Sequence, residues 1–330
     1  YTFVHSNGAT GPIEFEVCVE YADSDGTTGL FEYRVSIFTS EPTGWLRVGE
    51  EVLTQIKSSG TRRIILHRTN GKEGWSYLNE RRNVEEEFFG DPIDLGIFQL
   101  RDMIAHHSIQ QFRLAINSLW IFDLQPRSMK AAAQIVPNAT LEWDGSNIAA
   151  VLDTLGGEHR KSFDALSHDL SGIIPEIANL KLKTVDGSSK FLAFNEKGVS
   201  GDVLSFQASD GVLRAVAMLA ALHSPQQPNV LVFEEPENGI HPRRQDLLVD
   251  RLRQYTKAQS KPVQRQVIIT THSPYLLDSL DPNEVLIVSR NESGTRVEPI
   301  ANIEHVRHSM EDSSLGEIWH RGSIGGVPNP

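Results

Sequence analysis

Cysteine is nearly absent from the sequence. The chain of 330 residues has a single cysteine, Cys18, which cannot form an internal disulfide bond or a thiolate metal cluster by itself. This usage is typical of a cytoplasmic protein. Because Cys18 lies in the alternating apolar and polar pattern PIEFEVCVEYA, which is typical of a strand, we expect it to pack in the core.

Long apolar segments and an excess of basic residues are also lacking. No apolar run approaches the roughly 18 residues that span a bilayer, and the most apolar helical candidate, residues 211–222, contains Arg214. We therefore expect a soluble protein with no membrane-spanning segment. The net charge of −12 argues against nonspecific binding of nucleic acid over the whole surface. Local binding of DNA or RNA stays open because of three arginine pairs: Arg62 and Arg63, Arg81 and Arg82, and Arg243 and Arg244.

A third absence is the phosphate-binding loop of many nucleotide-binding proteins. The pattern G-x-x-x-x-G-K-[ST], whose backbone N–H groups surround phosphates, does not occur in the sequence. The nearest string, NGKEG at residues 70–74, lacks the first glycine, the hydroxyl residue and a following helix. We interpret NGKEG as a hairpin turn.

Hydrophobic periodicity changes twice along the chain. From about residue 10 to residue 80, alternating runs separated by turn sequences predict antiparallel strands joined by hairpins. Between about 97 and 180, apolar residues three and four apart indicate helices. Further on, apolar strands that alternate with amphipathic helices, the last strand being EVLIV, predict a parallel α/β core. We expect an α/β fold in three segments: an antiparallel β part at 1–96, a helical insertion at 97–200 and the core at 201–330.

Two adjacent glutamates follow one of the predicted core strands. The apolar run VLVF leads directly into Glu234 and Glu235. Side chains at the carboxyl ends of parallel strands project into the crevice where ligands bind. Adjacent residues in a strand point to opposite faces, so one carboxylate can hold a metal ion while the other addresses a different atom. The alternative is a strand end whose carboxylates reach solvent, and this motif alone does not decide between the two.

Two further segments place polar residues at the ends of elements. The strand VIITT is followed at once by His272, with Ser273 as a natural N-cap, so two consecutive strands end in what we expect to be one site. Ser209, Asp210 and Gly211 lead into a helix, whose N-terminal N–H groups and dipole attract anions. Taken singly, a histidine is usually structural, and Ser-Asp-Gly is an ordinary helix start.

Together, the segments ASDGVLR, VLVFEEPENGIHP and IITTHSPYLLD resemble the ATP-binding cassette (ABC) ATPases of the RecF, SMC and OLD type, especially the short AAA-like cassette ATPases of bacteria. DGSNIAAVLDTL at 144–155 and LGEIWHRGSIGGVP at 315–328 extend the resemblance to more than half of the chain. It implies the α/β fold of a P-loop NTPase, an ABC-type ATPase head that carries the antiparallel β part and the helical insertion.

The resemblance also implies roles for individual residues. Glu235 would be the catalytic carboxylate, and His272 the switch histidine. Glu234 would take the Walker B position that holds Mg²⁺ through water; many cassette ATPases have aspartate there, although Glu-Glu-Pro-Glu is common in this branch. The nucleotide-binding set, drawn from the signature helix and the D-loop, would be Ser209, Asp210, Gly211, Arg214 and Asn238.

The implied function is ATP hydrolysis with Mg²⁺ by a homodimer that closes over two shared ATP sites. Such an ATPase would control a separate effector, a nuclease or a toxin, in antiphage defence or DNA maintenance. In the family, the phosphate loop precedes the region that residues 1–22 resemble, so we expect it upstream of Tyr1. The alternatives are a nucleotide-regulated scaffold with little turnover and an ATPase that binds nucleic acid.

Overall fold

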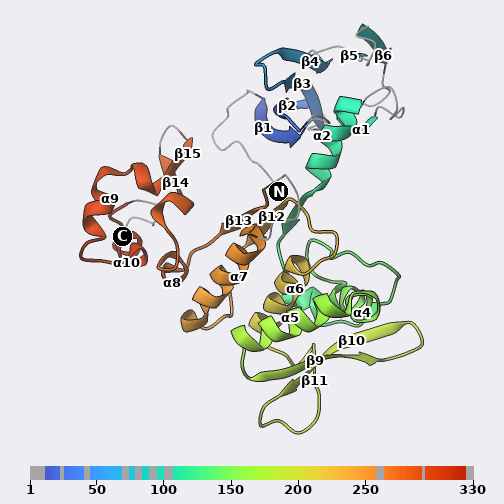
Figure 1. Ribbon diagram of the computed structural model, residues 1–330, viewed down its shortest axis with the longest axis vertical. Coiled ribbons are helices and arrows are strands. Elements are labelled where there is room, and N and C mark those ends of the chain that lie inside the picture. The colour runs from blue at the N-terminus through green and yellow to red at the C-terminus, as the bar shows by residue number, and fades with distance from the viewer. Residues whose placement is uncertain are drawn as a thin grey trace. The chain divides into compact units, whose positions relative to one another are not determined.

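The contacts within the computed structural model divide the chain into two compact units (Figure 1). The described residues up to Leu119 form unit 1, and those from Trp120 form unit 2. No helix among the described residues is long and apolar enough to cross a membrane. The segments 1–96, 97–200 and 201–330 stay a prediction about domain organisation. The structure describes residues 12–22, 26–40, 45–68, 74–78, 84–88, 95–99, 107–257, 264–291 and 294–324.

Unit 1 is an antiparallel sheet with a helix packed against one face. The six strands pair in chain order from β1 to β6, which confirms the antiparallel part predicted from the alternation. The rings of Phe31 and Tyr33 pack against Phe112 of helix α2, with centroid distances of 5.8 and 5.2 Å. The elements are β1 (Ile13–Ala22), β2 (Thr28–Ser40), β3 (Trp45–Ile56), β4 (Arg62–Arg68), β5 (Gly74–Leu78), β6 (Val84–Phe88), α1 (Gly96–Gln99) and α2 (His107–Asn117).

Two predictions for this unit have different outcomes. Strands β4 and β5 pair antiparallel, as a hairpin at NGKEG requires, although residues 69–73 of the turn lie outside the described residues. The prediction that Cys18 packs in the core is wrong, because Cys18 is exposed. It lies on the same exposed face of β1 as Glu14, Glu16 and Glu20, because side chains alternate between the two faces of a strand. Tyr21, at an odd-numbered position on the opposite face, is buried. The even-numbered glutamates of the strand thus mark the solvent-facing side, and Cys18 lies on that side.

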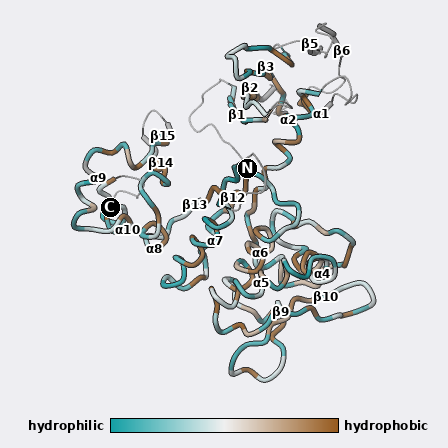
Figure 2. Tube along the Cα trace, viewed as in Figure 1, coloured by the Kyte–Doolittle hydropathy of each residue, from teal (hydrophilic) through white to brown (hydrophobic). Residues whose placement is uncertain are grey.

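Unit 2 is built around the buried helix α6 and a small sheet. Helix α6 (Asp210–Leu222) is buried along almost its whole length, and Figure 2 shows hydrophobic residues along it. The sheet has the order β13-β12-β7, and β12 and β13 are parallel, as predicted. The elements of the sheet and the helices of this part are β7 (Leu119–Phe122), α3 (Pro126–Met129), α4 (Ile148–Glu158), α5 (Arg160–Ile173), β12 (Val230–Glu234), η1 (Pro242–Arg244), α7 (Gln245–Lys257) and β13 (Gln266–Thr270).

A second sheet in unit 2 is formed by the strand sequence LKLKTVDGSSKFLAF and its neighbours. Strands β9 and β10 pair antiparallel, and β10 also pairs with β8 and β11. Leu180, Leu192 and Phe194 join the hydrophobic cluster that contains α6. The strands are β8 (Ala133–Gln134), β9 (Ile177–Thr184), β10 (Ser189–Glu196) and β11 (Val203–Leu204).

The C-terminal part of unit 2 has a hydrophobic cluster of its own, which includes Leu277, Ile287 and Leu315. Its strand EVLIV does not extend the parallel sheet as the alternation suggests. β14 pairs antiparallel with β15, with Val288 opposite Val297, because a following strand in hairpin register supplies its partner. The elements are α8 (Pro274–Leu277), η2 (Pro282–Glu284), β14 (Leu286–Asn291), β15 (Gly294–Pro299), η3 (Ile300–Asn302), α9 (Glu304–Ser309) and α10 (Leu315–His320). The chain is thus a mixed α/β protein with an antiparallel N-terminal sheet.

Candidate functional site

The ends of strands β12 and β13 lie side by side in unit 2. Glu234, the last residue of β12, is the register partner of Thr270, the last residue of β13. Because the strands are parallel, the residues that follow them emerge at the same edge of the sheet. Nε2 of His272 lies 3.7 Å from Oε1 of Glu235, and the two side chains are 79% and 39% exposed. The structure therefore brings together the two polar strand ends that the sequence places 37 positions apart.

Glu235 has an unusual backbone conformation. Its φ is +41°, in the left-handed region, which costs a residue with a Cβ about 1–2 kcal/mol. Its N–H donates to the carbonyl oxygen of Thr270 at 3.1 Å, and the side-chain amide of Asn238 donates to its Oε2. Strained backbone persists where the surroundings hold it, and it is concentrated at functional sites. Glu235 is thus held through its backbone by Thr270 and through its carboxylate by Asn238.

The turn after β12 packs against the start of helix α6. A Cβ on Gly211 would lie 2.1 Å from the carbonyl oxygen of Gly239, and one on Gly239 would lie 2.8 Å from the backbone nitrogen of Gly211. Gly239 also has φ +83°, so both positions require glycine. Ser209 caps α6, because its hydroxyl accepts the Val212 N–H at 3.3 Å. All three motifs singled out in the sequence thus meet in one part of unit 2.

Basic side chains surround the first turn of α6. Lys130 Nζ donates to the Asp210 carboxylate at 2.8 Å, and this bond lowers the pKa of Asp210, with smaller contributions from Arg214 and Arg127. The sequence singled out Asp210 and Arg214 but neither Lys130 nor Arg127. These two lie at the short helix α3, in a stretch with no motif, so no sequence signal marks them.

Glu237 is a second residue that the sequence did not single out. It is only 3% exposed, and burial raises the pKa of its carboxyl group. The Thr271 hydroxyl donates to Oε1 at 2.5 Å. Oε2 has no hydrogen-bond partner among the described residues. A buried carboxylate thus lies directly behind the strand ends.

The strand ends offer oxygen donors that suit Mg²⁺. Carboxylate oxygens from Glu234 and Glu235 and the Thr270 hydroxyl are hard ligands, and Mg²⁺ is usually bound by one or two carboxylates together with substrate phosphates and water. No group of three or more histidine, cysteine, aspartate and glutamate side chains in the described part of the chain forms a complete metal site. The oxygen donors present fit a Mg²⁺ ion whose remaining ligands are water and phosphate oxygens.

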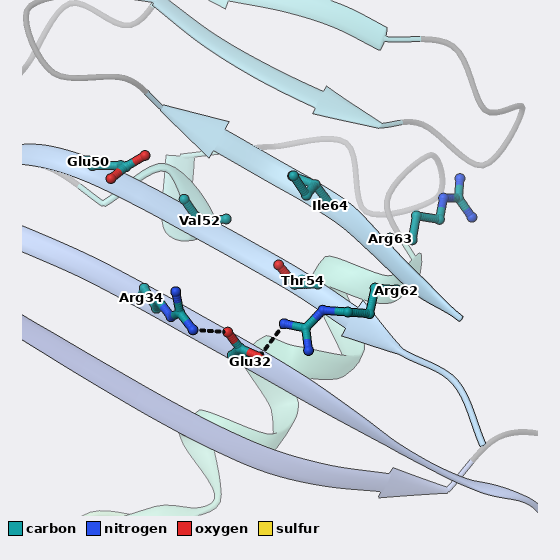
Figure 3. A pocket seen from close by; sticks show the side chains of 8 residues that line it. All are labelled: Glu32, Arg34, Glu50, Val52, Thr54, Arg62, Arg63 and Ile64. Atoms are coloured by element: carbon teal, nitrogen blue, oxygen red, sulfur yellow. Dashed lines mark hydrogen bonds and ion pairs between the residues drawn. The ribbon is translucent and has the colours of Figure 1, made fainter. Parts of the chain in front are cut away.

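Unit 1 contains a pocket of about 470 Å³ on its sheet (Figure 3). Glu32 lies between Arg34 and Arg62, with carboxylate-to-Nη2 distances of 2.5 and 2.6 Å. Because the Glu32 carboxylate is already held by two arginines, the strand ends of unit 2, where the three sequence motifs meet, are the better candidate for chemistry. The pocket is lined by Glu32, Arg34, Glu50, Val52, Thr54, Arg62, Arg63 and Ile64.

Residues 86–278 match the model of the family AAA_21, described as "AAA domain, putative AbiEii toxin, Type IV TA system". The chain belongs to the AAA_21 family. The matched range includes Ser209, Glu234, Glu235 and His272, and membership confirms the predicted ATPase cassette. It implies a nucleotide and usually Mg²⁺ as ligands of the family.

Three solved structures similar to this AAA_21 member are SMC heads. The SMC head domain from Thermotoga maritima has 11% identity and a TM-score of 0.33 over 82% of this chain and 74% of that chain. The Smc head bound to the C-winged helix domain of ScpA has 10% identity and a TM-score of 0.40 over 84% of this chain and 76% of that chain. The Pyrococcus furiosus Smc head bound to the C-terminal domain of ScpA has 8% identity and a TM-score of 0.38 over 88% of this chain and 83% of that chain. The TM-scores are low, and the family assignment does not depend on them. No curated protein sequence matches the chain.

At least one arginine of each described pair of the AAA_21 chain has a partner for its side chain. Arg62 contacts Glu32, and Arg244 donates to the carbonyl oxygen of Gly172 at 3.3 Å. Arg81 and Arg82 lie outside the described residues. Binding of DNA or RNA therefore stays a prediction.

Proposed function

We propose that the chain is a Mg²⁺-dependent ATPase whose catalytic carboxylate is Glu235. The observation that carries the proposal is the 3.7 Å approach of His272 to Glu235 at the ends of two adjacent parallel strands. Membership of an ATPase family supports it, since the matched range contains both residues. A strand end with two solvated carboxylates would not need a strained backbone at Glu235 or a histidine beside it.

Glu235 acts on the attacking water in this proposal. The amide of Asn238 occupies Oε2, which leaves Oε1, the atom nearest to His272, to orient the water and accept its proton. His272 is largely exposed, so its ring N–H can donate to the γ-phosphate.

Glu234 supplies the carboxylate that holds the metal ion. Mg²⁺, when bound, neutralises phosphate charge and polarises the phosphoryl group. Glu234 ends the strand β12, whereas Glu235 follows it in a left-handed backbone and accepts a hydrogen bond from Asn238, so we assign metal binding and water activation to separate carboxylates.

The test is ATP hydrolysis by the full-length natural protein with Mg²⁺ and with the ion chelated. We expect turnover only with Mg²⁺. Glu234→Gln should raise the Mg²⁺ concentration needed for half-maximal turnover, whereas His272→Ala should lower turnover without changing that requirement. Nucleotide binding without hydrolysis in the wild type would replace the ATPase by a nucleotide-regulated scaffold.

The proposal extends to a dimer that shares its sites. Ser209, Asp210 and Arg214 lie at a helix start surrounded by basic side chains, a setting that favours a phosphate supplied by another subunit. Mixing Ser209→Arg protein with Glu235→Gln protein should give turnover that differs from both separate variants. ATP should also promote dimer formation in sedimentation. The shared site would be contradicted if the mixture had the turnover of the separate variants and the protein stayed monomeric with ATP. Control of a separate nuclease or toxin through dimer closure would then be contradicted as well.

A further inference from the structure

Two buried polar side chains lie behind the candidate site. Glu237, in the turn after β12, is 3% exposed, and Gln245, the first residue of α7, is 5% exposed. Burying a carboxylate or an amide is unfavourable unless hydrogen bonds replace those made with water. The partners of both side chains therefore show what these residues hold in place.

Both side chains bond to the neighbours of His272. The Thr271 hydroxyl donates to Oε1 of Glu237 at 2.5 Å. The Ser273 hydroxyl donates to Oε1 of Gln245 at 2.6 Å. His272 is thus flanked on each side by a residue that is bonded to a buried side chain.

Two more bonds close the network. The Ser273 N–H donates to the Thr271 hydroxyl oxygen at 3.0 Å, and Nε2 of Gln245 donates to the carbonyl oxygen of Ile240 at 3.4 Å. Residues 271–273 are therefore tied to the 235–241 turn through Glu237 at one point and through Gln245 at another. The same turn carries Glu235 at its start.

The side chain of His272 contributes little to its own placement. It is 79% exposed, and its 3.7 Å approach to Glu235 is too long for a hydrogen bond. Its position relative to Glu235 is set instead by the backbone of the two segments. Glu237 also keeps one buried oxygen without a partner among the described residues, a cost that calls for an explanation near a functional site.

We propose that Glu237 and Gln245 are positioning residues that set the distance between Glu235 and His272. They do so by holding residues 271–273 against the 235–241 turn. The consequence for catalysis rests on the proposed ATPase function, but the placement of His272 does not.

The test uses the full-length protein and two readouts. The first is the NMR signal of the His272 ring, identified by its loss in His272→Ala. The second is kcat and KM for ATP. Glu237→Ala and Thr271→Val should move the ring signal and lower kcat by about 10- to 100-fold, the usual range for residues that orient a catalytic group, with little change in KM.

Glu237→Gln is the conservative variant. It keeps Oε1 as the acceptor for Thr271 and replaces only the oxygen that has no partner in the described residues, so it should keep the ring signal and kcat near wild type. The control is Glu50→Ala, at an exposed position of unit 1, which should leave the His272 signal unchanged.

An unmoved ring signal and an unchanged kcat in Thr271→Val would overturn the proposal, as would a loss in Glu237→Gln as large as in Glu237→Ala. Thr271→Val keeps the side-chain shape and decides the question if Glu237→Ala does not fold. A wild-type protein that fails to hydrolyse ATP would refute the proposed function, and the ring signal would then decide the positioning by itself.

Discussion

Glu51 in unit 1 and Glu237 in unit 2 are both buried, at 0% and 3% exposure, but their oxygens are used differently. Glu51 accepts hydrogen bonds from the Tyr33 hydroxyl at 2.9 Å and from the N–H groups of Gly96 and Ile97 at 2.9 and 3.2 Å. Both of its oxygens are occupied. Glu237 has Thr271 on one oxygen and no partner among the described residues on the other.

The difference separates two uses of a buried carboxylate. A fully bonded group fixes local structure, whereas a partly bonded one carries a cost in the low-dielectric interior. Burial raises the pKa of both groups. The N–H groups of Gly96 and Ile97, with Tyr33 and Arg68, oppose this rise of the pKa in Glu51, and the Thr271 hydroxyl with the N–H groups of Glu237 and His272 opposes it in Glu237. Glu51 fastens the start of α1 to β3, while Glu237 lies in the turn that carries Glu235. Unit 1 therefore uses its glutamate for stability, and unit 2 keeps one beside the candidate chemistry.

The largest effect is expected for Glu51→Ala. It removes the acceptor of a hydroxyl and two backbone N–H groups and the counter-charge of the buried Arg68, so it should lower the free energy of unfolding by about 3–5 kcal/mol. Urea denaturation measures this loss. The control is Glu50→Ala at the exposed neighbouring position, which should cost less than about 1 kcal/mol. Equal losses of stability in the two variants would mean that the hydrogen bonds of Glu51 do not stabilise unit 1.

A smaller, pH-dependent effect is expected for Glu237→Gln. Burial raises the folded-state pKa of Glu237 above the ordinary value of 4.5. The stability that proton binding adds is therefore fully present below that value and is lost as the pH rises through the raised pKa. Glutamine does not titrate, so the variant should become more stable relative to wild type as the pH rises from 4.5 towards 8.

Urea denaturation measures both slopes, above pH 4.5 for Glu237→Gln and below pH 4.5 for Glu284→Gln, the control of opposite sign. The hydrogen bond from Arg253 lowers the pKa of Glu284, so its contribution is present above the ordinary value and is lost as the pH falls. Slopes of the same sign in the two variants would contradict this account.

The smallest effect is expected for Glu235→Gly. Glycine relieves the left-handed backbone at φ +41°, which stabilises the fold by about 1–2 kcal/mol. Ordering the more flexible glycine on folding costs about 0.5–1 kcal/mol. Thermal unfolding should therefore show a net change between zero and a gain of about 1.5 kcal/mol. Glu14→Gly in the exposed face of β1 has no such strain to relieve and should lose stability. A loss in both would mean that Glu235 is not strained.

The sequence predicts much of this architecture but not the groups behind the site. Period-two alternation predicts the antiparallel strands of unit 1, and strand ends predict that Glu235 and His272 meet. Glu237 lies in the turn EEPENGIHP, which has neither a helical nor a strand period, so periodicity carries no information about its burial. Gln245 could have been found, because it occupies the same helical face as the buried Leu248, Val249 and Leu252.

The sequence pattern also cannot predict contacts between backbone segments that are far apart in the chain. The sequence marks Gly211 as a place where a phosphate can approach, yet in the structure its backbone is approached by Gly239. The strand β14 is predicted correctly as a strand, but its pairing with β15 depends on which edge is available rather than on its own residues. The chemistry of the strand ends is thus readable from sequence, and their support is a property of the fold.

ATP turnover by full-length Glu235→Gln tests the central claim most directly. The substitution is nearly isosteric, so ATP and Mg²⁺ should still bind while steady-state hydrolysis falls by about 10² to 10⁴, the usual contribution of a positioned general base. Glu14→Gln, on the exposed face of β1, should hydrolyse ATP like the wild type. Wild-type turnover in Glu235→Gln would contradict the account and leave a strand end with two solvated carboxylates.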